Sequence, residues 1–161
     1  ITSELIPRIS HYGEILDLEH NIKEEILIED KIFSQSDVGA HNTFIKNNML
    51  YTFDYEYSGI DDPAKTVCDL LIHPENILSE NSFCELINNL SRIKIFKNSL
   101  ERAKIIMPIY RYKWFGIILN GYIKNIKNPL KAQESLKKSI NYLESTKNKV
   151  KKVNRYNIVN Y

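Results

Sequence analysis

The sequence predicts one mainly helical domain with a single small β-hairpin. Apolar residues recur at helical spacing along most of the chain, and one β-prone stretch interrupts them. Hydrophobic residues make up 43% of the 161 residues, which is sufficient for one compact core. We therefore expect residues 1–161 to form a single domain.

The N-terminal part is expected to contain a helix followed by a loop. Apolar residues at the i, i+3 and i+4 spacing favour a helix from about Glu14 to residue 28, after interruptions at Pro7 and Gly13. Ile32 and Phe33 could form a very short strand, and the polar residues that follow them indicate a loop.

A β-hairpin is predicted where two β-prone runs flank Asn47 and Asn48. Asparagine tolerates positive φ, so this pair suits a tight turn. The hairpin would cover residues 43–54 and would hold Asn42 and Asp54 at the same end. We expect a loop at 57–63 after it.

Helices are predicted from residue 63 onward. Pro63 suits the first turn of a helix, Asp62 suits its N-cap, and this helix is expected to end near His73. Further helices are expected at 79–90 with Ser79 or Asn81 as the cap, at 92–106, at 109–127 after a break at Pro108, and from Pro129 onward.

Two of these helices carry specific predictions of burial. Apolar residues occupy most sides of 109–127, so we expect this helix to be the most buried one, with the aromatic residues of 110–115 in the core. The last helix is expected to bury the stripe formed by Ala132, Leu136, Ile140, Leu143 and Val150.

Charge and cysteine content limit the class of protein. A net charge of +2 is too small to indicate a nucleic-acid or membrane partner, and no apolar run reaches the ~18 residues of a membrane span. Cys68 and Cys84 have neither the spacing of a metal site nor that of a disulfide framework, and no secretory signal pattern is present. We expect free thiols and a cytoplasmic protein. Because the chain begins with Ile1, we also expect it to be part of a longer protein.

Residues 36–42 carry the candidate chemistry. Asp37 and Asn42 are five positions apart, and Asp54 follows at the far end of the predicted hairpin. Phosphoryl transfer needs one group that orients the acceptor hydroxyl and two oxygen ligands that hold magnesium against the nucleotide phosphates. The loop and the hairpin would bring three such side chains together.

Three short runs resemble one family: SDVGAHN at 36–42, FDYEYSG at 53–59 and DPA at 62–64. Together they resemble the aminoglycoside phosphotransferase and choline kinase-like family, a branch of the kinase-like fold, and the resemblance is densest over 35–73. It implies the helical C-terminal lobe of a protein-kinase-like fold, with the hairpin at the catalytic loop. The family loop usually carries a His two residues before the Asp. Gln35 stands there in this chain, and its amide could substitute by hydrogen bonding.

The resemblance implies a role for each of three principal residues. Asp37 would be the catalytic base, or at least the residue that orients the acceptor hydroxyl. Asn42 and Asp54 would bind Mg²⁺, whose coordination shell is completed by water and phosphate oxygens.

Three further residues have open roles. Glu56 could reach the metal's second shell or pair with a basic side chain. His41 could act as a base or ligand, although packing against the hairpin is the simpler expectation. The resemblance implies that Asp69 braces the catalytic loop by accepting backbone hydrogen bonds. The remaining histidines form no spacing that indicates a site; they are His11, His20 and His73.

The reaction implied by the resemblance is ATP- and Mg²⁺-dependent transfer of the γ-phosphoryl group to a hydroxyl of a small molecule. The acceptor would be a sugar, an amino alcohol or an aminoglycoside, and the acidic residues Glu56, Asp61 and Asp62 would suit a cationic one. With five glycines the chain has no Gly-rich phosphate loop, and it shows no strand lysine for the nucleotide. We expect the N-terminal nucleotide lobe to lie outside this chain and the chain alone to be a poor catalyst.

Two alternatives remain open. The departure at Gln35 and the missing nucleotide lobe would also fit a kinase-like domain that binds without catalysis. The mixed basic and aromatic run 110–115 and the lysine-rich C-terminal segment would fit a nucleic-acid-binding helical domain, although a core role and a solvated face are the simpler interpretations.

Overall fold

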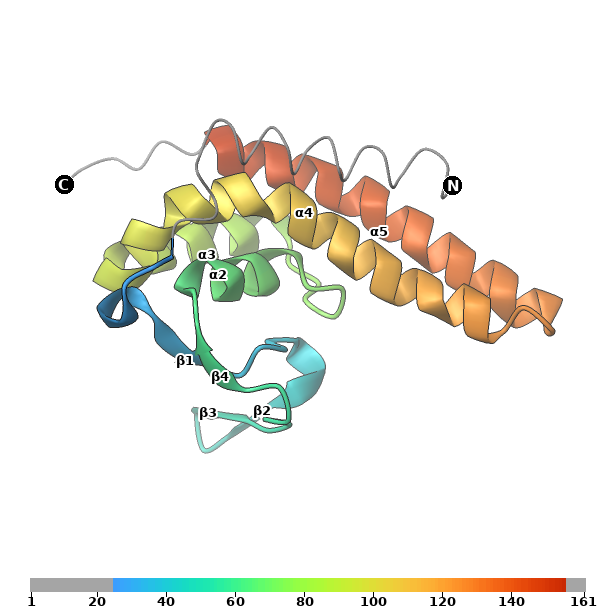
Figure 1. Cartoon of the computed structure of the whole chain (residues 1–161), viewed down its shortest axis with the longest axis horizontal. Helices are drawn as coiled ribbons and strands as arrows, with labels where there is room; N and C mark the ends of the chain where they lie inside the picture. The colour runs from blue at the N-terminus through green and yellow to red at the C-terminus, as the bar shows by residue number, and fades with distance from the viewer. Residues whose placement is uncertain (1–24, 156–161) are drawn as a thin grey trace.

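The computed structural model describes residues 25–155, in which four α-helices accompany two small antiparallel sheets (Figure 1). Most of the helix predicted from Glu14 lies outside this range. The elements in chain order are η1 (Ile28–Asp30), β1 (Ile32–Ser34), η2 (Ala40–Asn42), β2 (Thr43–Lys46), β3 (Met49–Thr52), β4 (Gly59–Asp61), α2 (Pro63–Ile72), α3 (Glu80–Arg92), α4 (Lys94–Lys124) and α5 (Pro129–Arg155).

The predicted hairpin is confirmed as the antiparallel pair β2 and β3. Its register joins Thr43 to Thr52 and Lys46 to Met49. The turn residues Asn47 and Asn48 have φ values of 51° and 58°, so both lie in the left-handed region that asparagine tolerates.

A second sheet, formed by β1 and β4, was only half predicted. The short strand at Ile32 and Phe33 is confirmed, but the expectation of a loop throughout 57–63 is wrong because Gly59–Asp61 pairs with it. Three residues are too few to show an alternating pattern, and the partners are separated by the whole hairpin. Such a pairing leaves no local signal in the sequence.

Helix α2 is the most buried helix of the described chain. It begins as predicted, with Pro63 in its first turn and the Asp62 side chain accepting a hydrogen bond from the Ala64 amide at 2.8 Å. Eight of its ten residues are buried. The prediction that 109–127 would be most buried is therefore wrong.

Helix α4 runs through Pro108 without a break, contrary to the two helices predicted there. Ala103 and Met107, just before the proline, are fully buried. Their packing offsets the ~3 kcal/mol that proline costs inside a helix.

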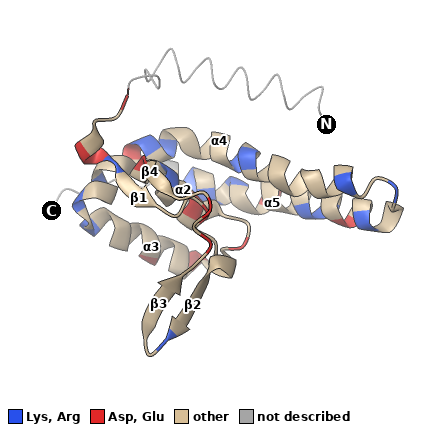
Figure 2. Cartoon of the chain, turned by 60° about the horizontal axis from the view of Figure 1, so that its bottom comes forward, with Lys and Arg blue, Asp and Glu red and all other residues tan. Residues whose placement is uncertain are grey.

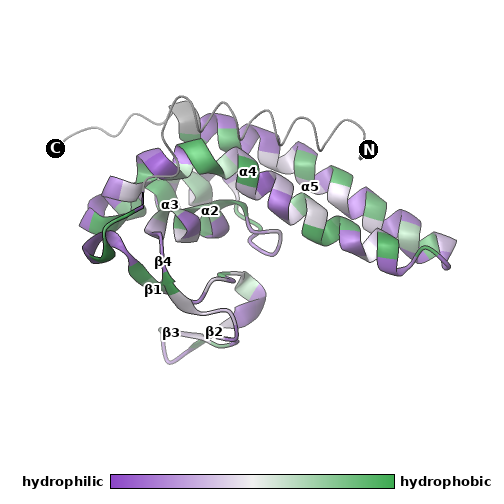
Figure 3. Ribbon diagram, viewed as in Figure 1, coloured by the Kyte–Doolittle hydropathy of each residue, from purple (hydrophilic) through white to green (hydrophobic). Residues whose placement is uncertain are grey.

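The C-terminal half of α4 packs mainly along α5, and the two helices extend together beyond the other described elements (Figure 1). Trp114 and Phe115 are buried there, as expected, whereas Ile117 and Ile123 are 47% and 61% exposed. Hydrophobic and hydrophilic residues accordingly alternate along both helices (Figure 3). A helix with one partner buries only one side, whatever its composition.

Helix α5 begins at Pro129 as predicted, and its predicted apolar stripe is confirmed in part, because Leu143 and Val150 pack against the two core clusters. Ala132 is buried, whereas Ile140 is 42% exposed. The buried positions include three hydroxyl residues whose groups are satisfied by backbone carbonyls, namely Ser139, Tyr142 and Thr146. Hydrogen bonding thus allows polar residues to lie on the buried face between the apolar positions.

The main core lies among α2, α3, α4 and α5, and a smaller cluster surrounds Trp114, Phe115 and Tyr142. Among residues 25–155, we find no helix with both the length and the apolar character needed to cross a membrane.

Candidate active site

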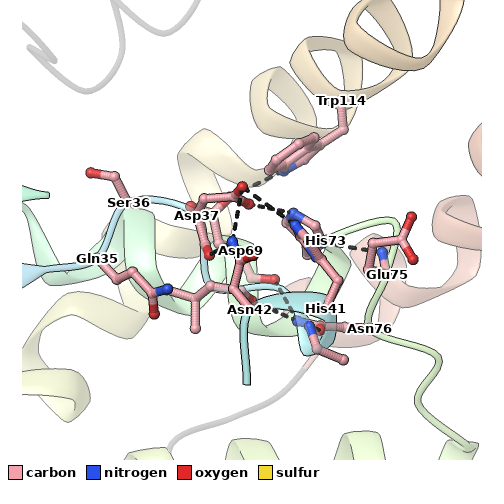
Figure 4. Close-up of polar contacts among 12 residues, drawn as sticks. Gln35, Ser36, Asp37, His41, Asn42, Asp69, His73, Glu75, Asn76 and Trp114 are labelled. Atoms are coloured by element: carbon pink, nitrogen blue, oxygen red, sulfur yellow. Dashed lines mark hydrogen bonds and ion pairs between the residues drawn. The ribbon is translucent and has the colours of Figure 1, made fainter. Parts of the chain in front are cut away.

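The loop between β1 and η2 holds Asp37 against the C-terminal end of α2 (Figure 4). His73, which follows α2, places its Nε2 2.8 Å from Asp37 Oδ1. Asn42 donates from Nδ2 to Asp37 Oδ2 and to the Asp37 carbonyl, both at 3.2 Å. The Asp37 side chain is still 30% exposed. Each carboxylate oxygen therefore has a protein partner, while part of the group faces solvent.

Ser36 gives the loop its shape just before Asp37. Its φ of 69° lies in the left-handed region. Lys65, in the first turn of α2, donates to Ser36 Oγ at 2.7 Å and pairs with Asp61. The Ser36 amide donates to Ser34 Oγ at 3.1 Å. These contacts tie the loop to both α2 and the small β1–β4 sheet.

The end of the hairpin is joined to the same loop. The Phe53 amide donates to the carbonyl of the buried Asn42 at 3.1 Å. The Gln35 amide donates to the Phe53 carbonyl and, at 3.5 Å, to the Asp54 carbonyl. The backbone of Asp54 therefore lies next to the loop. Asp54 has a left-handed φ of 63°, and its side chain is exposed. The hydrogen bonds of the Gln35 amide nitrogen therefore go to the end of the hairpin.

Asp54 and Glu56 share an electrostatic environment with Asp37. The Glu56 carboxylate is the first cause of a raised pKa at the exposed Tyr57, and smaller contributions come from lost hydration, Asp54 and Asp37. None of the described contacts pairs Glu56 with a basic side chain.

Asp69 is fully buried, and its carboxylate does not receive the loop backbone bonds that the resemblance implied. Its Oδ1 accepts a hydrogen bond from Trp114 Nε1 at 3.1 Å, whereas Oδ2 has no partner among the described residues. Burial raises the pKa of Asp69 to about 6, against the opposing charge of Lys113 and the Trp114 hydrogen bond.

Asn76 braces the loop instead, and no motif in the sequence predicts this role. Its Nδ2 donates to the Val38 and Asp69 carbonyls at 3.0 and 3.2 Å, and its Oδ1 accepts from the Ala40 amide at 2.8 Å. Only its place in the Pro-Glu-Asn turn after α2 could have drawn attention to it, and such turns are common.

His73 was also missed, because no spacing in the sequence links it to Asp37. It is 3% exposed, and burial lowers its pKa in spite of the nearby Asp37 carboxylate. His41, expected against the hairpin, stacks on His73 with ring centroids 5.4 Å apart. Its Nε2 lies 3.6 Å from Asp37 Oδ2.

No cluster of three or more His, Cys, Asp or Glu side chains that could hold a metal occurs within residues 25–155. Asn42 and Asp54 offer one amide and one carboxylate. Since the Asn42 Nδ2 is bonded to Asp37, its amide oxygen is the atom that can act as a ligand. Two such oxygens suit Mg²⁺, which usually takes its other ligands from phosphates and water.

Comparison with protein-family models found no match, and searches of curated proteins and of solved structures found none either.

Proposed function

We propose that this chain is the helical C-terminal lobe of a kinase-like phosphotransferase. It would act with ATP and Mg²⁺ to transfer the γ-phosphoryl group to a hydroxyl of a small molecule. One observation carries the proposal: Gln35 and the Asn42 carbonyl bond the end of the hairpin to the Asp37 loop. The backbone segments that carry the side chains of Asp37, Asn42 and Asp54 are therefore joined by hydrogen bonds. Phosphoryl transfer requires that combination.

Asp37 would orient the acceptor hydroxyl and accept its proton. His73 and Asn42 fix the direction of the carboxylate, and its exposed part is open to an acceptor. Asn42 and Asp54 would hold Mg²⁺, which neutralises charge on the transferred phosphoryl group. The nucleotide would be held mainly by a further lobe outside these residues, and the protein would act in the cytoplasm.

The acceptor is proposed only as a class: a sugar, an amino alcohol or an aminoglycoside. Asp61 is paired with Lys65, and Asp62 with Arg102 at 2.9 Å, so these two carboxylates have internal partners. The attraction for a cationic acceptor would then depend mainly on Glu56.

The nucleic-acid alternative is the least supported. Trp114 and Phe115 are buried, and Lys113 lies over the rings of Tyr110 and Trp114. Arg111 donates to Thr146 Oγ1 at 3.0 Å. Lys and Arg residues are spread along α4 and α5 (Figure 2). Steeply salt-dependent binding of single strands would revive this alternative.

The test is Mg²⁺-dependent nucleotide binding and turnover in the full-length protein, with a panel of small alcohols as acceptors. We expect Asp37→Ala to lower kcat by about 10²- to 10⁴-fold. Asp54→Ala should abolish the Mg²⁺ dependence of nucleotide binding. Asp30→Ala, which removes an exposed carboxylate from η1, is the matched control.

Each outcome selects one interpretation. Unchanged turnover in Asp37→Ala would rule out the enzyme as proposed. Mg²⁺-dependent nucleotide binding that is lost in Asp54→Ala, without turnover of any acceptor, would favour the kinase-like domain that binds without catalysis.

A further inference from the structure

We infer that His73 is the positioning residue for Asp37: its Nε2–H, fixed in one tautomer by the Glu75 amide, holds Asp37 Oδ1 in place. The inference rests on the proposed function for its catalytic consequence. The geometry itself is independent of that function (Figure 4).

The tautomer follows from the two ring nitrogens of His73. The Glu75 backbone N–H donates to Nδ1 at 3.1 Å, so Nδ1 carries no hydrogen. A neutral imidazole then has its hydrogen on Nε2, which lies 2.8 Å from Asp37 Oδ1. His73 is therefore a hydrogen-bond donor to the carboxylate.

The orientation of the ring is fixed by packing on several sides. The His73 and Trp114 rings meet edge to face, with their centroids 4.1 Å apart. The His41 ring stacks on His73 with a centroid distance of 5.4 Å. A Cβ added at Gly39 would come within 2.6 Å of His73 Cε1, so the loop backbone touches the ring directly. Rotation of the imidazole would require movement of the loop, η2 or α4.

The consequence is a carboxylate held at both oxygens. His73 donates to Oδ1 and Asn42 to Oδ2, which fixes the plane of the group. Loss of the His73 bond would leave Oδ1 without a donor, since Asn42 and His41 both lie against Oδ2, and would allow the carboxylate to rotate about χ2. Misplacement of a reacting group by about 1 Å can cost about 10²-fold in rate.

His73 does not serve as a proton relay in this arrangement. Protonation of Nδ1 would place two donors, Nδ1–H and the Glu75 N–H, opposite each other. The charged and titratable groups that act on His73 are Asp37, His41 and Glu75. Its contribution is geometric: it fixes the direction from which Asp37 meets the hydroxyl.

The first test is the ¹⁵N spectrum of the histidine rings in the chain at neutral pH. We expect His73 to show a protonated Nε2 and an unprotonated Nδ1, and we expect Asp37→Ala to move the Nε2 signal. A His73 that shows Nδ1–H, or the averaged signals of a free imidazole, would overturn the inference. This measurement does not depend on turnover.

The second test is turnover of two His73 variants in the full-length protein. His73→Leu removes the donor and should lower kcat about 10- to 100-fold with little change in KM. His73→Gln, whose amide nitrogen can reach Asp37, should recover much of the loss. Tyr142→Phe is the stability control: Tyr142 donates to the Ile72 carbonyl at the same end of α2, at 2.8 Å, without touching Asp37.

The results separate the two proposals. Equal losses of kcat in His73→Gln and His73→Leu, or a kcat loss in Tyr142→Phe as large as theirs, would reduce His73 to a packing residue. Absence of turnover in the unmodified protein would overturn the proposed function. In that case the spectrum alone would decide whether His73 holds Asp37.

Discussion

The helical region and the loop-and-hairpin region are held together by different interactions. The helices bury apolar side chains, with Leu71, Leu100 and Met107 at 1% exposure or less. The loop and the hairpin depend on side chains that bond backbone atoms, chiefly Gln35 and Asn76. Apolar hairpin residues stay exposed: Ile45 is 76% and Leu50 66% exposed. Burial stabilises the domain, whereas directional hydrogen bonds set the shape of the site.

The difference predicts where unfolding is local and where it is global. Amides in packed helices exchange with solvent mainly through global unfolding, whereas a region with few buried apolar contacts can open alone. The hairpin, which projects from the helices in Figure 2, should therefore open without loss of the helical core.

The largest expected effect is in the helical core. Leu71→Ala should lower the free energy of unfolding by about 2–5 kcal/mol, because Leu71 is fully buried in α2. Chemical denaturation measures it. Ile77→Ala is the control: Ile77 is 95% exposed, so its replacement should cost less than about 0.5 kcal/mol. Equal losses in the two variants would contradict the assignment of the core.

The second prediction concerns Asp69, a polar group inside the apolar region. Its pKa is raised from 3.8 to about 6 in the folded protein, so the folded state binds the proton more tightly than the unfolded state. Stability from this group is therefore fully present below about pH 4 and is lost as pH rises through about 6, by on the order of 3 kcal/mol.

Asp69→Asn removes this titration. The stability of the variant relative to the unmodified chain should rise by about 2–3 kcal/mol between about pH 4 and pH 7, measured by urea denaturation. The lowered pKa of His73 acts in the opposite direction, since its contribution is lost as pH falls below 6.5, but it is present in both proteins and cancels. Parallel stability curves would show that Asp69 does not titrate in this range.

The same division explains what the sequence could predict. Helical periodicity located α2, α3 and α5, and the cap at Asp62 and the Asn-Asn turn were readable because each acts on neighbouring residues. Asn76 and His73 bond atoms more than 30 positions away, and no periodicity records such contacts. Pro108 failed as a helix breaker because tertiary packing outweighed a local preference.

A third, smaller effect tests the polar attachment of the hairpin. Gln35→Ala removes the donor to the Phe53 and Asp54 carbonyls and should cost about 1–2 kcal/mol. The loss should appear as faster hydrogen exchange in 43–54, with little change in α2. Gln35→His, which keeps a ring N–H donor, should exchange more slowly than Gln35→Ala. Faster exchange throughout α2 would mean that the loop and the core unfold as one unit.

The smallest expected effect comes from replacing an asparagine with glycine, once in the hairpin turn and once in helix α5. Asn48 has a φ of 58°, where glycine avoids the Cβ penalty, so Asn48→Gly should stabilise the hairpin by up to about 0.5 kcal/mol. Asn141 is an exposed residue inside α5, and Asn141→Gly should destabilise by a few tenths of a kcal/mol, because glycine is the poorer helix former. Hydrogen exchange in 43–54 and in α5 measures both changes. Opposite signs are expected because the left-handed backbone of the turn favours glycine and the right-handed helix disfavours it. A loss of stability in both variants would show that the Asn48 side chain, rather than its backbone conformation, stabilises the turn.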